Sequence, residues 1–167
     1  MKSIALALTL VASPALAQTA WEVGKQVAGG AAVKTLEKQI NKRLLDEGRK
    51  NQCSFRSDSA EFEKACDKKM RNLANALVDA KRKLAEGGVQ NFKFEVSGHT
   101  DSSGNAQHNK ELSGRRAAVI VKELVARGVA PGDIVSVGMG SERRLVKPDD
   151  TPAKKARNRR YELRVKL

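Results

Sequence analysis

The chain has 167 residues, of which 40% are hydrophobic but only 4% aromatic, and it carries a formal net charge of +13. If an N-terminal export signal is removed, about 150 residues remain, which is enough for one compact domain and an appendage. The core must consist mainly of Val, Leu, Ile and Ala. So high a charge usually indicates nucleic acid or an anionic membrane as partner. The N-terminal pattern argues against nucleic acid and favours the anions of a cell envelope.

Residues 1–17 have the pattern of a secretory signal peptide. Lys2 precedes a short apolar run, and Ala15-Leu16-Ala17 supplies an Ala-x-Ala exit, so we expect cleavage after Ala17. The apolar run is too short for a transmembrane helix, and the alternative is a buried N-terminal helix. Gln18 follows the cleavage point, where a bacterial lipoprotein would have cysteine. We therefore expect an exported mature chain without a transmembrane segment.

Residues 18–50 form a first region, distinct from the domain that follows. Residues 18–30 are small and Gly-rich, which favours a flexible linker, although their four-residue spacing of small side chains also suits close helix packing. Residues 31–47 are predicted to form an amphipathic helix that ends at Gly48. Its apolar stripe consists of Val33, Leu36, Ile40 and Leu44. This helix either packs on the domain, binds another envelope protein or self-associates.

Residues 51–167 are predicted to form one α/β domain. We expect a strand at 51–56 and a helix from a capping box of Asp58 and Glu61 to about Glu86. A strand at 92–98, a helix at about 109–127 and a strand at 133–138 follow, and the chain ends in an alternating strand with Tyr161, Leu163, Val165 and Leu167 inward. The order β-α-β-α-β-β predicts a two-layer α/β sandwich.

The two cysteines are expected to form a disulfide. Cys53 lies on the predicted first strand and Cys66 on the apolar stripe of the first helix, so both side chains should enter one interface. In an oxidising compartment such a pair usually bonds, and so short a loop would contribute about 3 kcal/mol. Two buried thiols are the alternative. A metal site is not expected, because two cysteines and two histidines lack the spacing of metal ligands.

The turn after the strand at 92–98 carries the candidate site. Asp101 lies there, and Arg116 lies on the apolar stripe of the next helix with Asn109 and Leu112. A partly buried arginine needs a partner. One interpretation is a structural Asp101–Arg116 salt bridge. The other is a binding site, in which the carboxylate holds an ammonium and the guanidinium grips a carboxylate, as in the zwitterionic end of an amino acid.

Four motifs in order resemble the OmpA-like peptidoglycan-binding domain, over about residues 51–167. They are Phe55-Arg56-Ser57-Asp58-Ser59-Ala60-Glu61-Phe62; Gly98-His99-Thr100-Asp101-Ser102-Ser103-Gly104; Asn109 with Leu112-Ser113 and Arg116-Ala117; and Asn158-Arg159-Arg160-Tyr161-Glu162. The sequence departs from the family at Ser57, where a phenylalanine is usual, and at Lys155, where an arginine is usual. The loop from Ser141 to Lys155 is more basic than is typical of the family.

The resemblance implies a noncovalent, non-enzymatic receptor for the peptide stem of peptidoglycan, without a cofactor. In the family, the residues matching Asp101 and Arg116 hold the zwitterionic end of meso-diaminopimelate. Residues matching Asp58, Thr100, Asn109, Leu112 and Arg159 line or support that pocket. The resemblance also implies a periplasmic location, with association with the outer membrane as a further option.

Two other functions compete with wall binding. A wall hydrolase could use His99 and Asp101, but the sequence offers only two histidines, no suitable nucleophile and no zinc-binding set. An envelope adaptor could instead bind a protein or anionic lipid, through residues 18–50 or the basic region from Arg143 to Lys166, with little affinity for the wall. We expect the wall-binding role.

Overall fold

The computed structural model describes residues 15–167, and their side chains from residue 29 onward. Most of the predicted signal peptide therefore lies outside the described residues. The chain divides into two compact units, 1–34 and 35–167. Within the described residues, no helix combines the length and apolar character needed to cross a membrane.

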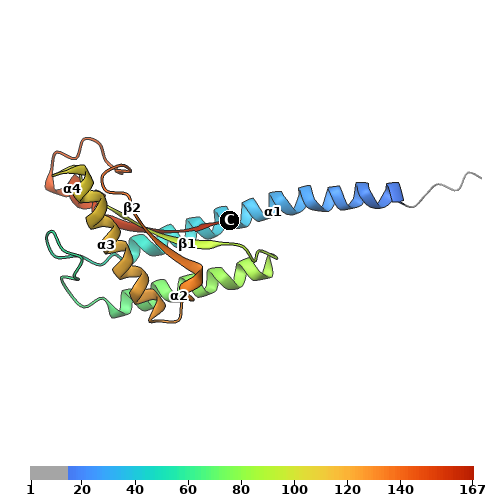
Figure 1. The fold of residues 1–167 in the computed structure, drawn as a ribbon, viewed down its shortest axis with the longest axis horizontal. Helices are drawn as coiled ribbons and strands as arrows, with labels where there is room; N and C mark the ends of the chain where they lie inside the picture. Colours follow the sequence, from blue (N-terminus) through green and yellow to red (C-terminus); the bar gives the residue numbers. More distant parts are fainter. Residues whose placement is uncertain (1–14) are drawn as a thin grey trace, which may run out of the picture. The chain divides into compact units, whose positions relative to one another are not determined.

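Four α-helices, one 3-10 turn and three strands make up the described chain (Figure 1). They are α1 (Ala15–Lys50), α2 (Asp67–Glu86), β1 (Lys93–His99), α3 (Ala106–Val125), η1 (Pro131–Asp133), β2 (Ile134–Gly138), α4 (Pro152–Asn158) and β3 (Arg160–Lys166). Residues 18–30 belong to α1, so the linker interpretation of their backbone is wrong. Its alanines are strong helix formers and it contains no proline, so its glycines do not break it.

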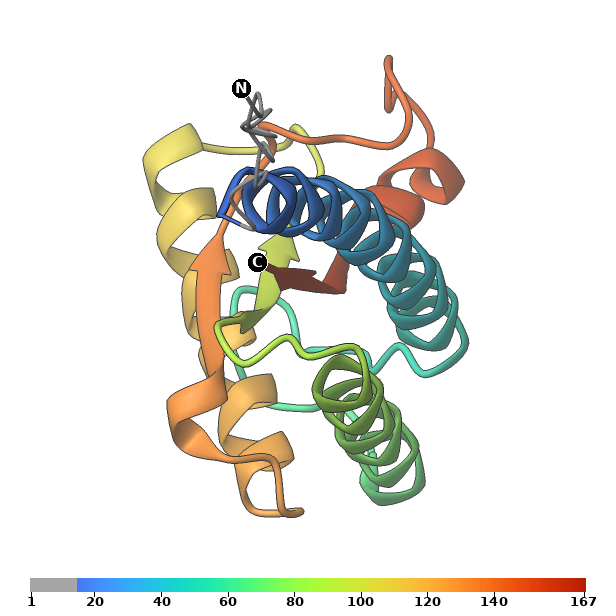
Figure 2. The ribbon, with the colours of Figure 1, turned by 90° about the vertical axis from the view of Figure 1, so that its right-hand side faces the viewer.

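The sheet has the strand order β2-β1-β3. β1 pairs with β2 in parallel and with β3 in antiparallel, so that Phe94 lies between Ile134 and Val165. Figure 2 shows the three strands at the centre of the second unit, with α2, α3 and the second half of α1 around them. The two-layer α/β fold is confirmed.

One hydrophobic core joins the helices to the sheet. Phe94 and Val96 of β1 are 1% and 0% exposed. α1 contributes Ile40 and Leu44 to the same core, so the second half of this helix packs on the domain. Leu167, predicted to face inward, is 46% exposed because it lies beyond the last residue pair of β3.

The predicted strand at 51–56 is reduced to a single β-bridge between Phe55 and Phe62. The free edge of β3 is instead covered by side-chain amides. Asn41 of α1 accepts from the N–H of Val165 at 2.7 Å and donates to its carbonyl at 3.1 Å. Gln52 makes the same pair of bonds with the backbone of Tyr161, at 3.2 and 2.8 Å. These amides satisfy backbone groups that a further strand would otherwise pair.

The capping box predicted at Asp58 and Glu61 is also wrong, because α2 begins nine residues after Asp58, at Asp67. Asp58 has a φ of 48°, which is incompatible with the start of a right-handed helix. Cys66 occupies the N-cap position of α2.

Candidate functional site

A groove of about 1270 Å³ lies in the second unit. It is bounded by the end of β1 and the turn after it, by α3, by the segment around 52–58, and by the start of β3. All seven predicted ligand-binding residues line it: Asp58, Thr100, Asp101, Asn109, Leu112, Arg116 and Arg159. The fold thus brings together side chains that are up to about one hundred residues apart in the sequence.

Close backbone contact sets the position of α3 over the ends of the strands. A Cβ atom at Gly98 would collide with the carbonyl of Ser113, and one at Gly138 with the carbonyl of Lys110. Only glycine allows so close an approach at both strand ends. α3 begins at Ala106, three residues before the predicted start, because the side chain of Asn105 caps it by accepting from the N–H of His108 at 3.0 Å.

Asp101 is held at the bottom of the turn and is 8% exposed. Its carboxylate pairs with the guanidinium of Arg159 at 2.7 Å and accepts from the N–H of Ser103 at 3.0 Å. The structural salt bridge considered between Asp101 and Arg116 does not form, because Arg159 takes that place. Burial opposes ionisation of Asp101, but the bonds from Arg159 and Ser103 outweigh it and hold its pKa below the ordinary value.

Arg116 is partly buried and is held without a carboxylate. Its Nε donates to the carbonyl of Ser59 at 2.8 Å and its Nη2 to the carbonyl of Arg56 at 3.1 Å. Its guanidinium carbon lies 5.2 Å from the ring centroid of Phe55. Burial lowers the pKa of Arg116, but a guanidinium stays charged at neutral pH. Within the part of the chain that the structure describes, Arg116 forms no ion pair. The fold therefore presents a fixed cation without an ion-pair partner to the groove, and Asp58 and Asp101 act on it only through longer-range attraction.

A buried cluster around Asp149 positions Asp101 and Arg159. Asp149 accepts from the N–H and hydroxyl of Ser102 at 2.9 and 2.6 Å, from Arg144 at 3.0 Å and from Asn158 at 2.9 Å. The bonds from Ser102 are the main reason why the pKa of Asp149 lies well below its usual range. Asp149 thus ties the residue after Asp101 to the residue before Arg159.

The sequence did not reveal this cluster, although Asn158 belongs to one of the quoted motifs. Asn158 is fully buried, and its oxygen accepts from the N–H groups of Leu145 and Val146 at 2.8 and 3.1 Å. It therefore fixes the course of the loop that carries Asp149. Polar residues so far apart in the sequence carry no periodic signal, and only the folded chain shows that they meet.

Thr100, Asn109 and Leu112 complete the wall beside Asp101. The hydroxyl of Thr100 donates to the carbonyl of Asp101 at 2.9 Å. The side-chain N–H of Asn109 donates to the carbonyl of Ser103 at 2.7 Å, which leaves the side-chain oxygen of Asn109 available to a ligand. Leu112 is 5% exposed and supplies an apolar surface.

Asp58 lies at the exposed rim of the groove and pairs with His108 at 2.6 Å. The hydrogen bond from His108 is the main cause that lowers the pKa of Asp58. His108 was not among the predicted site residues. His108 lies two residues after Ala106, the first residue of α3, and nothing in the sequence indicates that its side chain reaches Asp58, 50 residues earlier.

His99 and Arg160 belong to a buried part of the wall. Burial first, and then the nearby charge of Arg160, lower the pKa of His99 to about 4. Its Nε2 lies 3.2 Å from the hydroxyl of Ser97, but its Nδ1 has no partner among the described residues, so no carboxylate orients the ring. Because Ser97 and His99 are 4% and 3% exposed, the geometry gives no support to the hydrolase hypothesis.

Arg159 and Arg160 are neighbours in the sequence and both lie at the groove. Arg159 is directed to Asp101 in the groove, whereas the side chain of Arg160 is only 11% exposed and pairs with Glu162 at 2.6 Å. Both belong to the site region. Within the described residues, no group of His, Cys, Asp and Glu could hold a metal ion.

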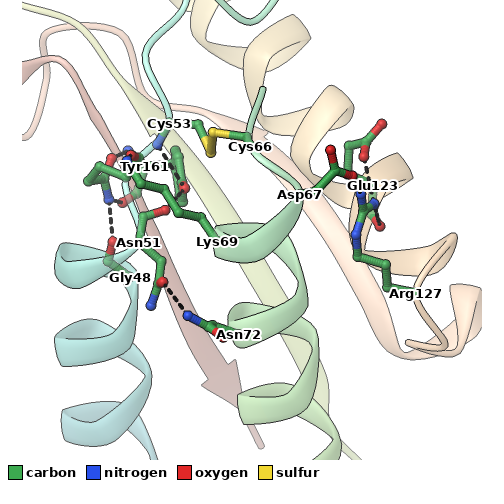
Figure 3. The surroundings of a disulfide bond; sticks show 11 residues. Gly48, Asn51, Cys53, Cys66, Asp67, Lys69, Asn72, Glu123, Arg127 and Tyr161 are labelled. Atoms are coloured by element: carbon green, nitrogen blue, oxygen red, sulfur yellow. Dashed lines mark hydrogen bonds and ion pairs between the residues drawn. A yellow bond between two sulfur atoms is a disulfide. The ribbon is translucent and has the colours of Figure 1, made fainter. Parts of the chain in front are cut away.

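The predicted disulfide between Cys53 and Cys66 is confirmed (Figure 3). It closes the segment that supplies the Arg56 and Ser59 carbonyls to Arg116. Beside it, the buried hydroxyl of Tyr161 accepts from the N–H of Cys53 at 3.2 Å and donates to the carbonyl of Asn51 (Figure 3). The disulfide therefore ties this part of the groove wall to the start of α2, and the hydrogen bonds of Tyr161 tie it to β3.

Several known proteins are similar to this chain. The peptidoglycan-associated lipoprotein of Pseudomonas aeruginosa is 26% identical over 163 residues, 98% of this chain and 95% of that protein. Outer membrane porin F of Pseudomonas fluorescens is 49% identical over 71 residues, and the peptidoglycan-binding protein ArfA of Mycobacterium tuberculosis is 41% identical over 73. These matches span 42% and 44% of this chain but only 22% of each of those longer proteins.

Solved structures confirm the fold. The peptidoglycan-associated lipoprotein of Burkholderia pseudomallei superposes with a TM-score of 0.57 at 22% identity, over 71% of this chain and 92% of that one. The periplasmic domain of Helicobacter pylori MotB gives a TM-score of 0.55 at 20% identity, over 69% and 70% of the two chains. Residues 54–159 match the OmpA family, which is more than half of the sequence. The chain belongs to the OmpA family.

Proposed function

We propose that this protein binds peptidoglycan noncovalently, through the diaminopimelate of the stem peptide. The observation that carries the proposal is the state of Arg116, a fixed cation without a carboxylate partner among the described residues, in the same groove as the ionised Asp101. Two relatives bear names that state association with, or binding of, peptidoglycan. An exported protein meets this polymer in the periplasm.

The ligand would use both charges. Arg116 offers its guanidinium to the α-carboxylate of diaminopimelate. Asp101 keeps acceptor capacity beyond its bonds to Arg159 and Ser103, since a carboxylate has about four lone-pair sites, and it receives the α-ammonium. Asn109 and Thr100 would add neutral polar groups, and Leu112 would supply an apolar wall. Asp58 and Arg159 would form the rim.

The domain organisation follows from the same proposal. Residues 51–167 would bind the wall in the periplasm after cleavage behind Ala17. Within residues 18–50, the first half of the helix would carry the attachment to a partner protein or to a second copy of the chain, because Ile40 and Leu44 of the second half are buried in the domain core. The protein would thereby tether itself or its partner to the wall, without catalysis.

Calorimetric titration of the mature chain with a tripeptide containing meso-diaminopimelate tests the proposal. Arg116→Gln and Asp101→Asn should each weaken binding by at least about 30-fold, as expected when one partner of a partly buried charge pair is removed. Arg115→Gln is the matched control, because Arg115 is the exposed neighbour on α3 and does not line the groove.

Thermal unfolding of each variant must show that it is folded, since Asp101 also holds Arg159. Sedimentation with purified sacculi provides a second readout. Unchanged affinity in folded Arg116→Gln and Asp101→Asn would refute the proposal. Sacculus binding that survives both variants but needs residues 18–34, which precede the second unit, would favour an adaptor.

A further inference from the structure

The groove is larger than the zwitterionic end of one amino acid requires, and it continues past Arg159 to the start of β3. There it is lined by Leu45 and Arg49 of α1 and by Ala156 and Arg157 of α4, which we call the basic end. Leu45 and Arg49 are one helical turn apart and share a helix face. Gln52, just after α1, is bonded to the backbone of Tyr161, and Arg157 lies four residues before Tyr161, so both arginines flank the start of β3.

The cations of the basic end are poorly compensated. Arg157 is exposed and forms no ion pair within residues 29–167. Arg49 has only Asp46, at 3.5 Å, with side chains 71% and 46% exposed, and such an exposed pair exchanges easily. By contrast, Arg160 is fully engaged by Glu162 and by the carbonyls of Asn158 and Arg143.

Carboxylates of the wall do not cancel this charge. Four of them line the groove: Asp58, Glu63, Asp101 and Glu162. Three have partners in His108, Arg159 and Arg160. Glu63 is exposed and forms no ion pair within residues 29–167, so one carboxylate of the wall stands against the two arginines of the basic end. The basic end therefore keeps two guanidinium groups for an external anion.

Apolar side chains accompany these two cations. Leu145, which is 52% exposed, lines the groove together with Ala156 and Leu45. An exposed leucine beside available arginines suits a ligand in which a small apolar group adjoins a carboxylate. A peptide extended along the groove from Asp101 presents such groups at intervals of one or two residues.

We propose that the basic end binds a second carboxylate of the same peptide whose diaminopimelate lies at Asp101 and Arg116. This inference rests on the proposed function and extends it to a further subsite. Arg49 precedes the region that matches the OmpA family, so the subsite depends on the α1 helix of this chain. The ligand class is an acidic peptide with two anionic groups, one at each end of the groove.

The test compares two double variants by calorimetric titration of the mature chain. Arg49→Gln with Arg157→Gln removes both cations of the basic end. Lys42→Gln with Lys147→Gln is the matched control, because it removes the same charge from exposed positions on α1 and on the neighbouring loop that do not line the groove. The probes are free meso-diaminopimelate, a tripeptide with diaminopimelate and a glutamate bearing a free carboxylate, and the same tripeptide with that carboxylate amidated.

We expect the arginine double variant to bind the acidic tripeptide about 3- to 10-fold more weakly than the unsubstituted protein. It should bind free diaminopimelate and the amidated tripeptide with unchanged affinity. The lysine double variant should leave all three affinities within about twofold. An equal loss in both double variants would show long-range attraction only and overturn the subsite. Equal affinity of the unsubstituted protein for the acidic and amidated tripeptides would overturn it too. If the subsite is overturned but Asp101→Asn still weakens binding strongly, the proposed function remains intact. If Asp101→Asn binds as tightly as the unsubstituted protein, the proposed function itself is refuted.

Discussion

Two charged regions of this domain differ in how far protein groups satisfy their charges and hydrogen bonds. Asp149 accepts four hydrogen bonds, all from protein groups, and is 4% exposed. Arg116, by contrast, is held by two backbone carbonyls and an aromatic ring, with no carboxylate from the described chain. The first region is closed and structural; the second has charge left over for a ligand.

The difference separates stability from recognition. Removing one member of a closed polar cluster lowers the free energy of unfolding strongly, because the partners of that member stay buried without hydrogen bonds. A charged group without an ion-pair partner contributes less to stability, and its removal mainly lowers the affinity for a ligand. Substitutions in the two regions should therefore affect different measurements.

The largest effect on stability is expected from loss of the disulfide. Replacing Cys53 and Cys66 together by serine should lower the free energy of unfolding by about 3 kcal/mol, measured by urea denaturation. It should also weaken tripeptide binding, because the released segment supplies the Arg56 and Ser59 carbonyls that hold Arg116. Reduction of the unsubstituted protein should reproduce both effects. Undiminished binding by the reduced protein would show that the segment needs no covalent closure.

Asn158→Ala breaks the closed region. It leaves Leu145 and Val146 N–H groups and Asp149 without their bonds to this side chain, so we expect a loss of about 2 to 3 kcal/mol in the free energy of unfolding. Arg116→Gln should cost less than about 1 kcal/mol by the same assay, while it weakens tripeptide binding by at least about 30-fold. A reversed order, with Arg116→Gln the more destabilising, would contradict the distinction between the two regions.

A smaller effect is expected from His99, which is buried in the wall of the groove. Its pKa in the folded protein is about 4, against an ordinary value of 6.5, so the unfolded chain takes up a proton over this range and the folded protein does not. The free energy of unfolding should therefore fall by about 1 to 2 kcal/mol between pH 6.5 and pH 4. Arg143, Arg160 and Arg164 add to this by repelling a charged ring, and Glu162 opposes them.

Urea titrations at several pH values measure this slope. His99→Gln should flatten it, whereas His108→Gln, at the exposed rim beside Asp58, provides the comparison for a histidine outside the core. A slope that is the same in His99→Gln and in the unsubstituted protein would assign the pH dependence to other groups.

The sequence predicted the features that depend on local pattern. The alternation in β1 and β3 gave the inward side chains of Phe94 and Leu163, and the helical spacing from Asn109 to Arg116 gave one face of α3. The disulfide followed from two cysteines on apolar faces. The ordered motifs predicted the family. Each of these signals lies within one element or in the identity of a residue.

What the sequence missed concerns pairing between distant segments. One interpretation paired Asp101 with Arg116, fifteen residues later, but Arg159, 58 residues away, takes the bond. Asp149 gave no signal, and the strand expected at 51–56 gives way to the amides of Asn41 and Gln52 on the edge of β3. Side-chain amides and a further strand can both satisfy the hydrogen-bonding groups at the edge of a sheet. An alternating pattern in the sequence therefore does not show which of the two will cover that edge.

By itself, then, the sequence determined the α/β domain and its disulfide, because periodicity and composition encode burial, and its family motifs indicated the residues gathered at the groove. Only the tertiary structure decided which charges are compensated. Arg159 and Arg116 are both arginines of family motifs, yet one is paired with Asp101 and the other keeps its charge for the groove. Compensation depends on distances of a few ångströms between elements, which no spacing along the chain specifies.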